Sequence, residues 1–168
     1  MIQSIQETPI TLASNTSSII FDEVDERDTS ATPCGWLCHQ KGSPLYQLIG
    51  NKCACEGVKK FLISFNANIS GATEGTPVAL ALYEDGIVVP GTTVISSIST
   101  ANSINNVSFN KIISVCPRTN STISVGSVGT IPNLTGTGDA GIATQAPTIL
   151  NANFIILESR NERWKYTR

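Results

Sequence analysis

From Phe61 onward, apolar and polar residues alternate in short segments that end at glycine, proline or asparagine. Residues 61–69 show this most clearly, because every odd position is apolar and most even positions are polar. Successive side chains of a β-strand point to opposite faces of its sheet. The pattern therefore predicts a strand with one face in a core and the other mostly in water.

Residues 78–83 are apolar at even and odd positions alike, which predicts a strand that is buried on both faces. In an antiparallel domain, we expect a neighbouring subunit to cover the second face. Glu84-Asp85-Gly86 predicts a hairpin turn, since Asp-Gly supplies the positive φ that tight turns need, and residues 87–89 form the return strand.

Further runs of β-branched and aromatic residues predict an antiparallel protein of about eight strands with almost no helix. The expected strands are residues 93–100, 106–116, 122–128 and 153–157, with shorter ones at 18–21 and 46–49. Residues 117–120 form a turn between two of these strands. Residues 129–147 are rich in Gly, Thr and Pro and lack periodicity, which indicates a functional loop or an interface element.

The chain divides by composition into three parts. Residues 1–31 are polar and then acidic, and we expect an extended N-terminal arm that serves as an anchor. Residues 32–157 form the β-domain, which includes a cysteine-rich segment at 34–55. Residues 158–168 are charged and too short to fold alone, so we expect a C-terminal tail that docks on a partner.

The composition narrows the range of partners. Hydrophobic residues make up 40% of the chain but charged residues only 14%, and the formal net charge is −2. This polar, weakly ionic surface offers no field that would gather phosphates, so we expect neither nucleic acid nor a membrane surface as a partner. No apolar run approaches the roughly 20 residues of a membrane span, and residues 1–11 lack the pattern of a secretory signal.

The chain contains few side chains that could act as a catalytic acid, base or nucleophile. His39 is the single histidine, its neighbour Cys38 would point away from it in a strand, and no Gly-x-Ser-x-Gly elbow occurs. The acidic run at residues 22–26 has the character of a solvated charge cluster rather than of a catalytic carboxylate pair. We therefore predict a protein that is not an enzyme, with no catalytic, cofactor-binding or metal-binding residues.

The cysteines leave three alternatives open. Cys34, Cys38, Cys53 and Cys55 could bind zinc together with His39, could form disulfides, or could remain thiols. The Cys53-x-Cys55 spacing is tight for zinc, which favours the other two. Cys116 lies in a predicted strand, so we expect a buried core thiol.

Two other features receive a structural interpretation. Asn-x-Ser/Thr sequons are expected by chance in a chain this rich in Asn, Ser and Thr; they occur at Asn15, Asn68, Asn106, Asn120 and Asn133. Trp36 and Trp164 are expected to pack or dock rather than to bind sugars.

Three stretches resemble the tumour-necrosis-factor-like and complement-head-like jelly rolls found in phage virions and on spore surfaces. They are the alternating segment 61–70, the segment 78–92 with its Asp-Gly turn and Val-Pro-Gly-Thr ending, and the combination of 107–109 with 143–147 and 153–157. The resemblance covers about residues 43–157. It implies an antiparallel jelly-roll β-sandwich that assembles as a compact homotrimer.

The resemblance also implies a function. In phage relatives such modules are capsid decorations, head fibres or tail tips, so we expect a virion structural protein assembled in the bacterial host cytoplasm. Its expected partners are two further copies of itself and, through the N-terminal arm, capsid or tail proteins. The alternative is a trimeric bacterial cell- or spore-surface head that binds a receptor or a host-surface glycan.

Overall fold

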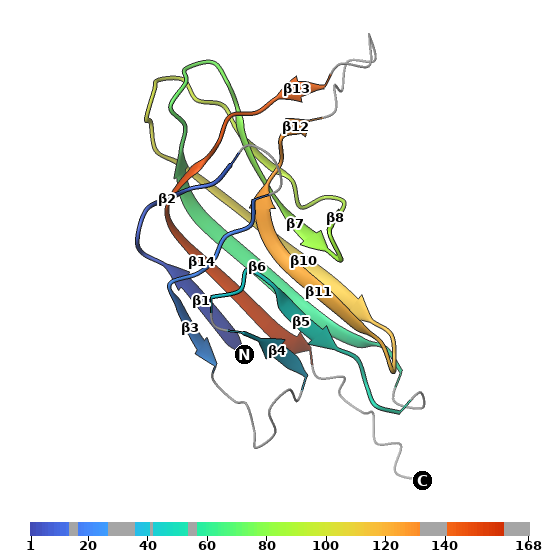
Figure 1. The fold of residues 1–168 in the computed structure, drawn as a ribbon. Coiled ribbons are helices and arrows are strands. Elements are labelled where there is room, and N and C mark those ends of the chain that lie inside the picture. Colours follow the sequence, from blue (N-terminus) through green and yellow to red (C-terminus); the bar gives the residue numbers. More distant parts are fainter. Residues whose placement is uncertain (14–16, 27–35, 41, 54–56, 132–140, 160–168) are drawn as a thin grey trace.

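The computed structural model describes residues 1–13, 17–26, 36–40, 42–53, 57–131 and 141–159. Within these ranges every regular element is a β-strand (Figure 1). The strands are β1 (Ile2–Gln6), β2 (Ile10–Thr11), β3 (Glu23–Glu26), β4 (Leu37–His39), β5 (Tyr46–Ile49), β6 (Lys59–Ser70), β7 (Val78–Glu84), β8 (Ile87–Val88), β9 (Val94–Ser96), β10 (Asn105–Val115), β11 (Asn120–Ser127), β12 (Thr130–Ile131), β13 (Ile142–Ala143) and β14 (Thr148–Ser159).

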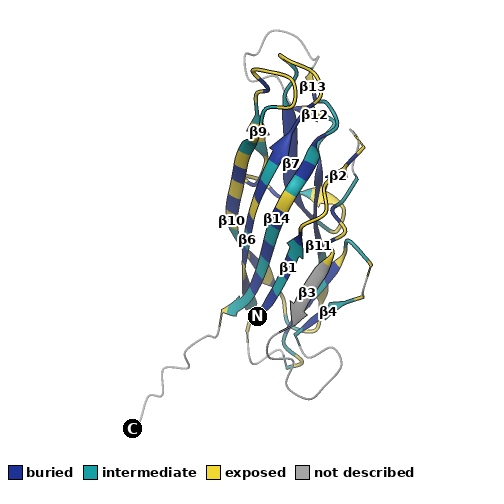
Figure 2. Cartoon of the chain, turned by 90° about the vertical axis from the view of Figure 1, so that its left-hand side faces the viewer, coloured by how far each residue is buried: buried dark blue, intermediate teal, exposed yellow. Residues whose placement is uncertain are grey.

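Two antiparallel sheets pack face to face (Figures 1 and 2). Sheet A has the order β10-β6-β14-β1-β3, with β2 also paired to β14, and sheet B has the order β4-β5-β11-β7-β8, with β9 also paired to β7. Along the chain, the long strands cross repeatedly from one sheet to the other, so that sequence neighbours are seldom sheet neighbours. This is the jelly-roll arrangement of an antiparallel β-sandwich.

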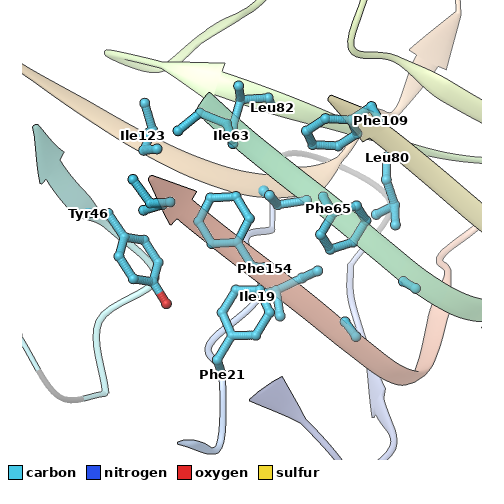
Figure 3. Close-up of a cluster of buried hydrophobic side chains, with 14 of the residues drawn as sticks. Ile19, Phe21, Tyr46, Ile63, Phe65, Leu80, Leu82, Phe109, Ile123 and Phe154 are labelled. Atoms are coloured by element: carbon cyan, nitrogen blue, oxygen red, sulfur yellow. The ribbon is translucent and has the colours of Figure 1, made fainter. Parts of the chain in front are cut away.

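The core fills the space between the sheets, as Figure 3 shows. The alternating residues predicted for the core face of β6 are all buried; they are Phe61, Ile63, Phe65, Ala67 and Ile69. Aromatic rings join the two sheets, with Tyr46 of sheet B meeting Phe154 of sheet A edge to face at 5.2 Å between ring centroids. Such contacts add to the stabilisation that burial alone provides.

The predicted turns are confirmed. Asp85 and Gly86 between β7 and β8 have φ values of 49° and 80°, as a type I′ hairpin turn requires. The turn after β10 also contains a left-handed residue, Arg118, with φ of 63°. The strand bounds differ more: β14 begins at Thr148, five residues before the expected strand, and β9 is only three residues long.

The N-terminal segment differs from the expected arm. β1 pairs with both β14 and β3, and β2 pairs with the start of β14. Four described side chains that lie before β4 are in the core; they are those of Ile2, Leu12, Ile19 and Phe21. Residues 1–13 and 17–26 are therefore part of the sandwich rather than an extension from it, because β14 would otherwise have an unpaired edge and the core an open end. The remainder of the expected arm, residues 14–16 and 27–31, lies outside the described residues.

The expectation that a neighbouring subunit covers β7 is wrong. Both faces of β7 are already buried within one chain, including the outward-facing Ala79 and Ala81. These side chains are small, and larger ones flank them: Ile95 lies directly opposite Ala79 in the register. On the same face, the Tyr83 hydroxyl donates a hydrogen bond to the Ser127 carbonyl at 2.7 Å. Two-sided burial therefore needs no second copy here.

The C-terminal tail expected at residues 158–168 begins inside the sheet. β14 extends to Ser159, and the Glu158 carboxylate lies 3.3 Å from the Lys59 ammonium on the neighbouring strand. Residues 160–168, which include Trp164, lie outside the described part of the chain. None of the described residues form a helix long and apolar enough to cross a membrane.

Candidate functional site

His39, the one histidine, is held in a structural contact at the edge of sheet B. Its ring stacks on Tyr46 with 4.2 Å between centroids. Its Nε2 lies 2.9 Å from the Ser43 carbonyl oxygen, within hydrogen-bonding distance. Both contacts position the imidazole against the sandwich, and neither brings it to a nucleophile.

Of the three alternatives for the cysteine-rich segment, the two cysteines that the structure describes form disulfides. Cys38 in β4 and Cys53 after β5 are both disulfide-bonded. A sulfur in a disulfide is not a thiolate, so these two residues are not zinc ligands. Cys34 and Cys55 lie outside the described residues. Where the structure describes the chain, no three His, Cys, Asp or Glu side chains gather as a metal ion would require.

Cys116 is a free thiol but not a core residue. β10 ends at the buried Val115, and Cys116 follows in the turn with its side chain exposed. The expected strand, residues 106–116, ended one residue too late. Because side chains alternate along a strand, the residue after the buried Val115 faces away from the core.

The acidic run begins with a structural carboxylate. Asp22 accepts hydrogen bonds from the backbone amides of Glu7 and Thr8, at 3.1 and 2.8 Å, and from the Gln6 side chain at 3.0 Å. These donors, led by the Thr8 amide, hold the pKa of Asp22 below its ordinary value. The carboxylate closes the turn after β1, which is a folding role. The remaining acidic residues of the run belong to β3.

The outer face of sheet A carries an unusual combination of exposed apolar and uncharged polar residues. One row across it is apolar: Leu62 of β6 lies directly between Ile112 of β10 and Leu157 of β14. Ile112 is 58% exposed and Leu62 is 38% exposed. Ile155, on the same face one row along β14, adds to this apolar row. We call these four residues the apolar row.

Beside the apolar row lies a network of side-chain amides. Asn106 of β10 donates hydrogen bonds to Asn66 and to Asn68 on β6, at 3.3 and 3.0 Å. Asn68 in turn donates to Asn151 of β14 at 3.0 Å, and Gln3 of β1 donates to Asn153 at 3.3 Å. The network thus spans β10, β6 and β14, the separate Gln3–Asn153 pair joins β14 to β1, and both present donors and acceptors without charge.

Across β10, β6, β14 and β1, this face is nearly neutral. The outward positions of β10, β6, β14 and β1 carry Asn, Ser, Gln, Ile and Leu, and the exception is Lys60 at one end. Ordinary soluble domains have roughly 25% charged residues overall, and most of these are on the surface. A neutral face with an exposed apolar row has the character of an interaction surface.

The sequence contained a signal for the apolar row, but only the register reveals it. Leu62 and Ile112 each stand on the polar side of an alternating strand, where isolated apolar residues are common and need no explanation. The two lie 50 positions apart in the chain, and antiparallel pairing of β6 with β10 places them opposite each other.

No protein-family model matches the chain, and no curated protein matches it. Among solved structures, it is similar to the exo-β-1,3-galactanase Pc1,3Gal43A from Phanerochaete chrysosporium, at a TM-score of 0.23 and 10% identity. That alignment covers 90% of this chain and 27% of the galactanase. At that level of similarity the match supports no conclusion about function.

Proposed function

We propose that this chain is a structural protein of a phage virion, a homotrimeric jelly-roll head of the capsid-decoration or fibre type. The observation that carries the proposal is the neutral outer face of sheet A with its apolar row. The described residues of the site carry out no chemical step in this role, and the surface acts through its shape and its contacts.

The face suits contact with copies of the same chain. Burial of Leu62 and Ile112 against a partner would remove apolar area from water, at about 25 cal/mol per Å². Because the face bears almost no charge, a second copy meets no like-charge repulsion across it. The asparagine amides can both donate and accept hydrogen bonds, so they can pair with polar groups of either kind on a neighbouring copy.

The number of copies follows from the resemblance to trimeric jelly-roll heads together with closed symmetry. Cyclic assembly buries an adhesive face in a finite particle and leaves no open end for further growth. Since residues 1–13 and 17–26 are built into the sandwich, the proposal does not use them as a free anchor. The trimeric head itself is proposed to dock on capsid or tail proteins.

The trimer is tested by size-exclusion chromatography with light scattering at micromolar concentration. Wild type is expected at three times the chain mass, and Leu62→Glu is expected to be monomeric because it places a charge in the middle of the apolar row. Ile87→Glu is the matched control, since Ile87 is 74% exposed and lies in β8 of sheet B. A monomeric wild type, or a Leu62→Glu variant that remains a trimer, would overturn the interface.

The virion assignment is tested separately, by cryo-microscopy of particles from the phage that encodes the chain. Threefold density that fits the sandwich supports the proposal. Particles of full composition without such density refute it, even if the isolated protein is a trimer.

The asparagine network favours a second candidate, a cell- or spore-surface head that binds a glycan. Side-chain amides are well suited to hydrogen-bond sugar hydroxyls, and Asn66, Asn106 and Asn110 on this face are exposed. On a glycan array, retention that is lost in Asn106→Ala would favour this candidate. Absence of the protein from particles would then separate it from the first.

A further inference from the structure

β4 is a weak element in a position that matters for the core. It has three residues and lies at the outside of sheet B, and among the described strands it pairs with β5 alone. Yet Leu37 of β4 is buried in the core, and Trp36 just before it packs on Phe61 with 5.8 Å between ring centroids. Backbone pairing over three residues holds Trp36 and Leu37 only weakly against the core, because the ends of short edge strands fray.

A covalent bond lies at the centre of this weak element. Cys38 is the middle residue of β4, and its sulfur is in a disulfide. Cys53, which follows the partner strand β5, is also disulfide-bonded. Both β4 and the segment leaving β5 therefore carry a covalent bond that exists only in the oxidised protein.

We propose that the disulfides form a redox lock on the β4 edge of sheet B. In the oxidised protein β4 stays on β5 and covers the end of the core. In the reduced protein β4 leaves β5, which exposes Trp36 and frees the outer edge of β5 while the rest of the sandwich remains folded.

The chemistry of locking is ordinary thiol–disulfide exchange. Two cysteine thiols of the chain and one low-molecular-weight disulfide give one protein disulfide and two low-molecular-weight thiols, so two electrons pass to the small disulfide and the two protons go with them. Cytosolic thiol pools keep cysteines reduced, whereas the medium outside a cell allows disulfides to persist. A head made in the cytoplasm would thus be unlocked during assembly and locked after release. This timing rests on the proposed function, but the lock itself does not.

One backbone hydrogen bond reports directly on the lock. The Ile49 amide donates to the Trp36 carbonyl at 2.8 Å, across the junction of β5 with the β4 segment. Amide hydrogen exchange at Ile49, measured by NMR on the full chain, therefore follows β4 alone. The Phe65 amide in β6, in the middle of sheet A, is the internal control for global unfolding.

The experiment compares the oxidised protein with the protein reduced by a phosphine, both in a Cys116→Ser background that removes the free thiol. Exchange at Ile49 is expected to accelerate by roughly tenfold or more on reduction, the size expected when a loop-closing disulfide is lost. Exchange at Phe65 is expected to stay unchanged. Cys38→Ser in the same background, kept oxidised, is expected to match the reduced protein at Ile49.

Two results would overturn the lock. Unchanged Ile49 exchange on reduction would show that pairing alone holds β4. Equal acceleration at Ile49 and Phe65 would show that the disulfides support the whole fold and not one edge. Neither result depends on whether the chain trimerises or enters a virion, so this test fails or succeeds independently of the proposed function.

Discussion

Asp85 shows how one side chain can join three strands. Its positive φ forms the turn from β7 to β8, while its carboxylate accepts hydrogen bonds from the Thr122 amide at 2.7 Å and the Thr122 hydroxyl at 2.9 Å. Ser121 adds a contact from its hydroxyl at 3.1 Å. The hairpin turn is thereby fixed to the start of β11.

These donors make stability depend on pH. The Thr122 amide, followed by its hydroxyl and that of Ser121, lowers the pKa of Asp85 below its ordinary value. A lowered folded-state pKa stabilises the protein above the unfolded-state pKa of about 3.9, and that stabilisation is lost as the pH falls through the folded-state pKa. The Asp85 carboxylate therefore stabilises the protein at neutral pH and ceases to do so in acid.

We expect Asp85→Asn to lower the free energy of unfolding at pH 7 by less than about 1 kcal/mol, since solvent screens this exposed carboxylate. Asparagine tolerates the left-handed conformation, so the turn itself is kept. Urea unfolding of both proteins across a pH series measures the difference, which should shrink below about pH 4. A difference that is constant down to strong acid would show that the carboxylate charge plays no part.

At the scale of elements, β7 shows that a strand apolar on both faces can be covered by its own chain. Its inward residues meet sheet A across the core, while its outward alanines lie beneath larger neighbours. Tyr83 spans part of this outer face, and burial raises the pKa of its phenol by disfavouring the charged form. The strand belongs to the middle of sheet B and not to a subunit boundary.

Tyr83 variants test this cover. Tyr83→Phe keeps the ring but removes the hydrogen bond to the Ser127 carbonyl, and we expect a loss of about 1 kcal/mol in the free energy of unfolding. Tyr83→Ala also removes the ring and should cost about 3 kcal/mol or more. Both are measured by urea unfolding. Light scattering should find the oligomeric state unchanged in each, whereas dissociation of the assembly by Tyr83→Phe would place β7 at an interface after all.

The whole molecule is a sandwich whose sides are closed in different ways. On one side, the Lys111 ammonium of β10 in sheet A donates to the Pro90 carbonyl at 2.8 Å, beyond β8 in sheet B. On the other, the N-terminal strands extend sheet A past β14. The outer face of sheet A remains exposed, with Ile112 58% and Leu62 38% exposed, and the proposed trimer uses this face.

An interface of this kind should respond weakly to salt. Because the face holds amides and aliphatic side chains, screening of charges has little to act on. We expect the dissociation constant of the trimer to change by less than about threefold between low ionic strength and about 1 M NaCl, where the Debye length is only about 3 Å. Analytical ultracentrifugation measures this. A strong weakening by salt would indicate that ion pairs hold the assembly and would direct attention to other surfaces.

The class of fold and its most local features could be predicted from the amino-acid pattern. Alternation along residues 61–69 identified the core face of β6, and the Asp-Gly pair identified the β7–β8 turn, because strand periodicity and positive φ are properties of a few adjacent residues. Tyr46–Ile49 was predicted with the bounds that β5 has. The charge deficit was also visible, since composition needs no structure.

Tertiary structure decided everything that depends on partners distant in the chain. β1 has a polar-looking sequence, yet it is a strand because Ile2 and the hydrogen-bonded pair Ser4 and Tyr46 are buried between the sheets. The apolar row exists only because pairing places Leu62 between Ile112 and Leu157. Strand register and sheet packing decide which side chain covers Ala79. They also decide which polar residues are buried and which apolar residues stay exposed. A linear pattern of residues contains neither the register nor the packing.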